Sequence, residues 1–101
     1  MTNDDLSSSY LIKAEKRLKI LDILMKEEDY SDVVREAQEI VELAQKSILR
    51  KLGIDPPKWH DVSDIILANL ELIPDEIHQD IKKIINITKW LRGEREISFY
   101  G

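Results

Sequence analysis

The segment Arg95-Glu-Ile-Ser-Phe-Tyr-Gly101 contains the residues of this chain whose types and spacing best suit chemistry. Arg95 carries a planar guanidinium, which can hold a phosphate through two parallel hydrogen bonds. Tyr100 offers a phenolic hydroxyl, a group whose ordinary pKa of about 10 keeps it protonated at neutral pH. A phenol in this state donates a hydrogen bond or accepts a transferred group, and it is a poor base. The pair therefore favours phosphate binding over phosphodiester cleavage.

Helix geometry limits how these two residues can act together. Positions five residues apart are separated by about 140° around an ideal helix, so Arg95 and Tyr100 do not share a face. They converge only if the helix ends between them or if each comes from a different subunit. A dimer would bring two arginines together, and a bound anion would offset their repulsion. In the simpler alternative, Arg95 pairs with a carboxylate such as Glu96 and Tyr100 packs against Phe99.

A second set of candidates, Glu42, Lys46 and Arg50, follows i, i+4, i+8 spacing away from the apolar stripe of a helix. In one interpretation they form a solvated face that contains a weak Glu–Lys pair. In the other, Glu42 and Lys46 line a cleft beside the fourth helix and bind a nucleotide or phosphate. The first helix also carries a basic cluster that consists of Lys13, Lys16, Arg17 and Lys19. This cluster is either a solvated face or a contact surface for RNA or for an acidic partner.

Four helices must position these residues. Apolar residues recur at helical spacing, which predicts helices over about 10–26, 31–52, 62–70 and 74–100. Gly53 is suited to ending the second helix, and two prolines keep the next loop from being helical. The predicted fold is an all-α, antiparallel up-and-down bundle over residues 9–101, preceded by a disordered leader over residues 1–8. The stripe predicted for the first helix is Leu11, Ala14, Leu18, Leu21 and Met25.

Composition excludes several classes of protein. A length of 101 residues suits one domain, and 20 acidic against 15 basic residues give a net charge of −5. This balance argues against a broad nucleic-acid-coating surface. Cysteine is absent, and the two histidines have no obvious co-ligands, so we expect no metal site and no cofactor. The sequence shows no membrane span or signal peptide, which predicts a cytoplasmic protein without membrane partners.

Three motifs in order resemble the HEPN family of small helical proteins. They are the helix YSDVVREAQEIVELAQKSILRKLGI, the segment PPKWHDVSDIIL and the ending REISFYG. The resemblance implies a homodimer with its fourth helices close to the two-fold axis, and a further C-terminal helix that this sequence lacks. Many relatives are metal-independent ribonucleases, which carry an arginine that is followed, after four to six intervening residues, by a histidine. Others partner a minimal nucleotidyltransferase in toxin–antitoxin pairs, and some accept AMP on a tyrosine.

Arg95 and Tyr100 occupy the motif positions as Arg-x4-Tyr, without the histidine of the ribonucleases. We therefore expect a nucleotide- or phosphate-binding dimer that is the partner or AMP-accepting substrate of a minimal nucleotidyltransferase. Arg95, Lys46 and Glu42 would bind nucleotide or RNA phosphate, and Arg95 and Tyr100 would carry any catalysis. The alternatives are a metal-independent ribonuclease toxin and a structural oligomerisation module.

Overall fold

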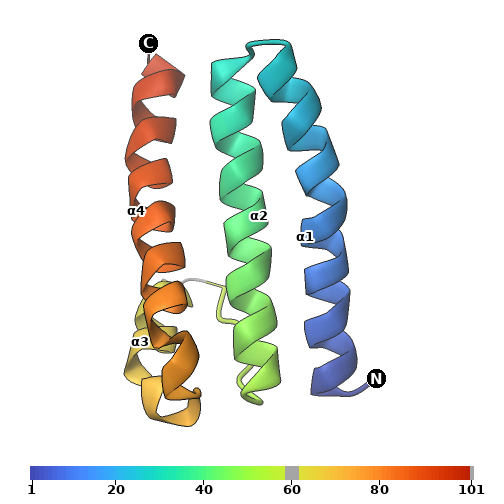
Figure 1. Ribbon diagram of the computed structural model, residues 1–101, viewed down its shortest axis with the longest axis vertical. Helices are drawn as coiled ribbons and strands as arrows, with labels where there is room; N and C mark the ends of the chain where they lie inside the picture. The colour runs from blue at the N-terminus through green and yellow to red at the C-terminus, as the bar shows by residue number, and fades with distance from the viewer. Residues whose placement is uncertain (59–61, 101) are drawn as a thin grey trace.

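The computed structural model describes residues 1–58 and 62–100, and of residues 95–100 it describes the backbone alone. In Figure 1, three long antiparallel helices stand side by side with α2 in the centre, and α3 lies beside the lower part of α4. The described residues form helices and loops, and no strand occurs among them, which confirms the predicted all-α bundle. The elements are α1 (Asn3–Lys26), α2 (Tyr30–Lys51), α3 (Val62–Ala68), η1 (Leu70–Leu72), η2 (Asp75–Ile77) and α4 (His78–Tyr100).

The C-terminal end of α2 follows from a glycine in the left-handed conformation. Gly53 has a φ of +81°, which an L-residue adopts only at a cost in free energy. The amide of Gly53 donates to the carbonyl of Arg50 at 3.0 Å, and the amide of Ile54 donates to that of Leu49 at 2.9 Å. This pattern is a Schellman motif, which ends the helix as predicted and turns the chain back along its last turns.

The first eight residues differ from the predicted disordered leader, because α1 begins at Asn3. Thr2 caps the helix, and its hydroxyl accepts from the amide of Asp5 while the Asp5 carboxylate accepts from the amide of Thr2. These hydrogen bonds lower the pKa of Asp5. Buried Ser7 and Ser47 each donate a hydroxyl hydrogen bond of 2.9 Å to the other's carbonyl. An apolar pattern cannot reveal an anchor made of two serines.

The face that α1 turns toward α2 also differs from the predicted stripe. Leu11, Leu18 and Met25 are about half exposed, although the stripe placed them in the core. Ser7 and Ala14 are buried instead, and these small side chains let the two helices approach closely. The prediction failed because it ranked residues by hydrophobicity, whereas a close helix pair selects small residues at the contact.

The apolar core lies between α2, α3 and the first half of α4. Its cluster of buried residues consists of Leu49, Val62, Ile66, Ile73, Ile81 and Ile85. One polar group crosses this core, because Gln45 is only 2% exposed and donates to Ser63 Oγ at 2.8 Å and to Thr88 Oγ1 at 3.2 Å. Thr88 in turn donates to the carbonyl of Ile84 at 2.8 Å. A buried amide with partners on two other helices fixes the register of α2 against both.

Two glycines allow a matched test of the helix end. We expect Gly53→Ala to destabilise the fold by about 1 kcal/mol, because alanine must adopt the positive φ. The same change at Gly93 should stabilise the fold by up to about 1 kcal/mol, because a Cβ added to this helical glycine meets no described atom within 4 Å beyond its own turn of helix. Urea unfolding followed by circular dichroism measures both. If both substitutions changed the free energy of unfolding in the same direction, the result would contradict the role assigned to Gly53.

Candidate functional site

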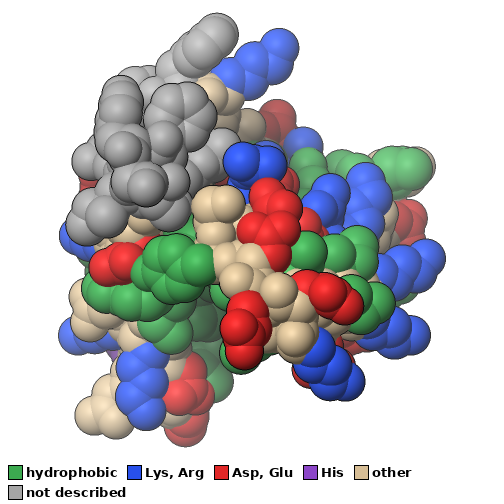
Figure 2. Space-filling view, turned by 90° about the horizontal axis from the view of Figure 1, so that it is seen from above, with side chains coloured by type: hydrophobic (Ala, Val, Ile, Leu, Met, Phe, Trp, Pro, Cys, Tyr) green, Lys and Arg blue, Asp and Glu red, His purple; other side chains and the backbone are tan. Residues whose placement is uncertain are grey.

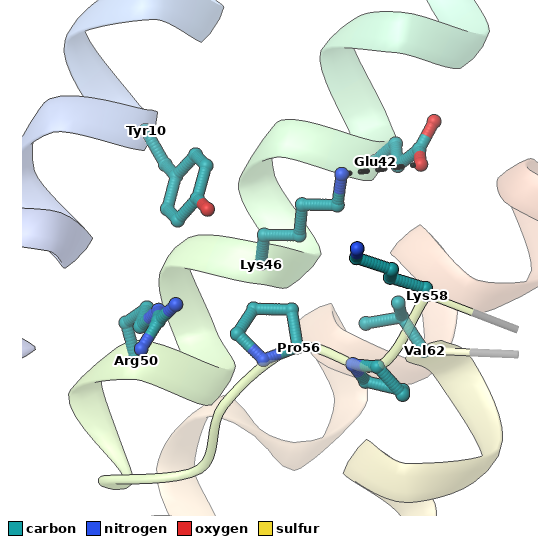
Figure 3. A pocket seen from close by; sticks show the side chains of 8 residues that line it. Tyr10, Glu42, Lys46, Arg50, Pro56, Lys58 and Val62 are labelled. Atoms are coloured by element: carbon teal, nitrogen blue, oxygen red, sulfur yellow. Dashed lines mark ion pairs between the residues drawn. The ribbon is translucent and has the colours of Figure 1, made fainter. Parts of the chain in front are cut away.

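A pocket of about 320 Å³ opens between α1, α2 and the loop that leads to α3. Its lining is drawn in Figure 3 and combines charged groups with rings. The helix α2 contributes three residues one turn apart, because the i, i+4, i+8 spacing places them on one face. The lining consists of Tyr10, Glu42, Lys46, Arg50, Pro56, Pro57, Lys58 and Val62.

The cations of the pocket are only partly neutralised. Lys46 Nζ lies 3.4 Å from the Glu42 carboxylate, and both side chains are partly exposed, so the pair is weak. Lys58 makes no ion pair with any residue that the structure describes. In Figure 3, the side chains of Lys46 and Lys58 both extend toward the part of the pocket near Glu42. Two ammonium groups directed at one region repel each other, and a bound anion would relieve that repulsion.

Arg50 supplies the third positive charge. Its guanidinium pairs with Asp55 in the following loop, but the Asp55 side chain is 87% exposed, so water screens the pair. The Nε of Arg50 is buried and finds no acceptor among the described residues. Most buried donors in proteins are paired, and an unpaired one costs free energy.

The remaining lining consists of rings and apolar groups. The partly buried ring of Tyr10 stands on the α1 side of the pocket, and its hydroxyl points inward in Figure 3. Pro56 and Pro57 form part of the opposite wall, and buried Val62 lies beside them at the start of α3. A site with cations together with flat apolar surfaces suits a ligand that has both an anionic group and a ring.

The structure brings Glu42 and Lys46 together, as the sequence predicted, but in a different place. Their pocket lies between α1 and the 53–58 loop, and no described side chain of α4 lines it, whereas the cleft was expected beside the fourth helix. Sequence reasoning missed Tyr10 and Lys58 as members of the site. No spacing rule connects them to α2, because Tyr10 comes from the preceding helix and Lys58 from a loop that folds back.

The side chains of Arg95 and Tyr100 lie outside the described residues, so their predicted roles rest on the sequence. The backbone of α4 is helical through Tyr100, which excludes a helix end between the two positions. Immediately before Arg95, the carboxylate of Glu94 accepts a hydrogen bond from the Tyr30 hydroxyl. That bond raises the pKa of Tyr30 above its ordinary value of 10. It fastens α4 to the start of α2.

The two candidate sets are therefore far apart within one chain. Glu94, the neighbour of Arg95, contacts Tyr30 at the first turn of α2. Lys46 lies sixteen residues further along α2, which corresponds to about 24 Å of helix. A single ligand of mononucleotide size cannot span both positions in one chain. The set of Arg95, Lys46 and Glu42 is thus divided between two ends of the bundle.

The basic cluster of α1 is also divided. Arg17 forms a 3.0 Å ion pair with the largely buried Glu36 of α2, so it belongs to the helix contact and not to the open face. Lys13, Lys16 and Lys19 are exposed. Figure 2 shows the molecule from above, with acidic and basic side chains interspersed over the described surface in view. The described side chains in this view form no continuous basic surface for a nucleic-acid strand.

The remaining sequence predictions concern the start of the third helix, a metal site and a membrane span. Trp59, His60 and Asp61 of the motif PPKWHDVSDIIL lie outside the described residues. Among the described side chains, those of residues 1–58 and 62–94, no group of three or more acidic or histidine residues is arranged to hold a metal ion. No helix in this part of the chain combines the length and apolar character that crossing a membrane requires.

Comparison with known proteins agrees with the fold and with the motifs. The model of the HEPN domain matches residues 7–101, which is nearly the whole chain and includes the pocket and the segment that ends α4. No curated protein and no solved structure shows significant similarity to the chain. Helix order, the end of α2 and the family match together lead to one conclusion: the chain belongs to the HEPN domain family.

Proposed function

We propose that this HEPN chain is a phosphate- or nucleotide-binding dimer that is the partner, or the AMP-accepting substrate, of a minimal nucleotidyltransferase in a toxin–antitoxin module. The observation that carries the binding function is the pocket of α2, where the described lining combines the cations of Lys46, Arg50 and Lys58 with the carboxylate of Glu42. Three cations against one anion favour an anionic ligand. The partner role rests on the family resemblance.

The alternative enzymatic function, a metal-independent ribonuclease, is less well supported. Such a reaction needs a group that takes the proton of the 2′-hydroxyl and a group that protonates the leaving oxygen. The motif at the end of α4 has tyrosine where the ribonucleases have histidine, and a phenol is protonated at neutral pH. Binding needs only the cations, so the residues present favour binding over cleavage.

Binding of inorganic pyrophosphate tests the anion site directly. We expect Lys46→Gln to weaken binding about tenfold or more, because a hydrogen bond to a charged group is worth about 1.5–3 kcal/mol. Lys82→Gln makes the same chemical change at an exposed position of α4 outside the pocket and should leave the affinity unchanged. Isothermal titration calorimetry at two salt concentrations measures both. Absence of pyrophosphate binding to the wild-type chain would refute the anion site.

Exposed apolar residues on α4 support the homodimer. Ile87 is 47% and Trp90 58% exposed, and large apolar side chains on one helix face are typical of a protein interface. Aromatic residues of this kind often supply much of the binding energy of such contacts. Their position on α4 agrees with the family's placement of the fourth helices near the two-fold axis.

We expect Ile87→Asp to convert the dimer to a monomer, because burying a carboxylate in an apolar contact costs several kcal/mol. Ile23→Asp is the matched control, since Ile23 is at least as exposed but lies on α1. Light scattering over a range of protein concentrations measures the mass of each variant. A monomeric wild-type chain, or dissociation by the α1 variant alone, would contradict a dimer built on α4.

Transfer of AMP to the chain tests the substrate role. In this reaction the tyrosine hydroxyl oxygen attacks the α-phosphorus of ATP, a phosphodiester forms, pyrophosphate leaves, and the nucleotidyltransferase takes the proton. We expect the mass of the intact chain, measured by mass spectrometry, to increase by one or more AMP groups after incubation with the partner nucleotidyltransferase and ATP. The increase should vanish in Tyr100→Phe and persist in Tyr30→Phe. An unmodified wild-type chain, or modification that survives Tyr100→Phe, would be evidence against Tyr100 as the acceptor.

A further inference from the structure

Two surfaces of the molecule have no part in the proposed function, an apolar groove at one end of the bundle and the outer face of α1. We propose that these two surfaces bind each other between copies of the chain, so that α1 of one copy docks in the groove of the next. This contact joins two different surfaces, unlike the symmetric contact proposed for α4. It involves neither the pocket of α2 nor the segment with Arg95 and Tyr100.

The groove is a cavity of about 440 Å³ between the end of α2, the segments η1 and η2, and the start of α4, at the lower end of the bundle in Figure 1. Leu72 is 56% exposed and Ile77 43%, so the fold leaves part of the apolar wall open. Open apolar surfaces of this kind are typical of binding sites. The described lining consists of Ile48, Lys51, Leu52, Leu72, Ile73, Pro74, Ile77, Asp80, Ile81 and Ile84.

The rim of the groove is acidic. From residue 59 to residue 81 the sequence contains six acidic residues and no lysine or arginine. Lys51, the cation of the described lining, is already paired with Asp4 of α1 at 3.1 Å. A complementary occupant is therefore apolar at its centre and basic at its edges. The exposed acids of η1, η2 and the start of α4 are Glu71, Asp75, Glu76 and Asp80.

The outer face of α1 has this complementary character. Its three isoleucines, Ile12, Ile20 and Ile23, are between 46% and 60% exposed. At about 100° per residue they lie about 120° or more around the helix from buried Ala14, so they point away from α2. Exposed Lys16 lies among them on the same face. From residue 8 to residue 21 the chain has four basic residues and one acidic residue. A helix with apolar anchors and basic neighbours suits an acidic apolar groove.

The two surfaces cannot meet within one chain. The helix α2 stands between α1 and α4 in Figure 1, and the isoleucines of α1 point away from it. Complementary surfaces at separate places on one molecule join different copies, and every copy at an end of such an assembly keeps a free groove or a free helix. The assembly therefore grows with protein concentration unless it closes into a ring. Because lysines and carboxylates attract each other across the contact, salt weakens it.

Sedimentation velocity of the full chain tests this contact in the Ile87→Asp background, which removes the contact proposed for α4. At about 0.05 M salt we expect the average mass to rise with protein concentration above that of a monomer. At about 0.5 M salt it should fall toward the monomer, because screening shortens the range of the charges. Leu72→Asp in the groove and Ile12→Asp on α1 should each weaken association about tenfold or more, since each places a carboxylate in an apolar contact.

A mixture of the two variants distinguishes this contact from a symmetric one. Each variant retains the surface that the other has lost, so the equimolar mixture should form a heterodimer that neither variant forms alone. If Leu72→Asp or Ile12→Asp does not fold, as judged by circular dichroism, Ile77→Asp or Ile20→Asp makes the same change at a neighbouring position of the same surface.

Three results would overturn the proposal. They are a chain that stays monomeric at every concentration, association that Leu72→Asp leaves intact, and a mixture that stays monomeric. Failure of pyrophosphate binding or of the α4 dimer would leave this proposal standing, because neither involves the groove or the outer face of α1. Salt also separates the two contacts in the wild-type chain, since the apolar contact proposed for α4 does not depend on charge.

Discussion

The way α2 ends is the constraint on which the pocket depends. The positive φ of Gly53 and the two hydrogen bonds of the Schellman motif reverse the chain at this point. Asp55 then pairs with Arg50, so that the loop runs back along the last turns of the helix it has just left. Pro56, Pro57 and Lys58 face residues of α2 for this reason. Without the reversal, the charged face of α2 would be an ordinary solvated surface.

The central position of α2 explains how one helix supports both the core and the candidate binding site. One side packs closely on α1 through Ser7 and Ser47, and another packs on α3 and α4 through Gln45. These buried hydrogen bonds fix the helix without using its charged residues. The face with Glu42, Lys46 and Arg50 therefore remains free to line a cavity. The result is a local positive site in a protein that is acidic overall.

The opposite end of the bundle has a different character. Tyr30 and Glu94 join α2 to α4 just before the segment that contains Arg95 and Tyr100. Because α4 stays helical through Tyr100, these two positions cannot converge within one chain by a break in the helix. A shared site at this end requires a second copy, and the exposed Ile87 and Trp90 on α4 offer an apolar surface for one. In the proposed function the two ends have separate tasks, ligand binding at one and association at the other.

The sequence by itself determined the helices, their order and the stop at Gly53, because helical periodicity and glycine conformation are local properties. It also indicated that Glu42 and Lys46 lie next to each other, since residues at i and i+4 share a helix face. Only the tertiary structure decided that residues 3–8 join α1, that small side chains and not leucines face α2, and that Tyr10 and Lys58 line the pocket. Each of these features depends on contacts between segments far apart in the chain. Such contacts are determined by the fit of side chains and by hydrogen bonds, and these leave no periodic pattern in the sequence.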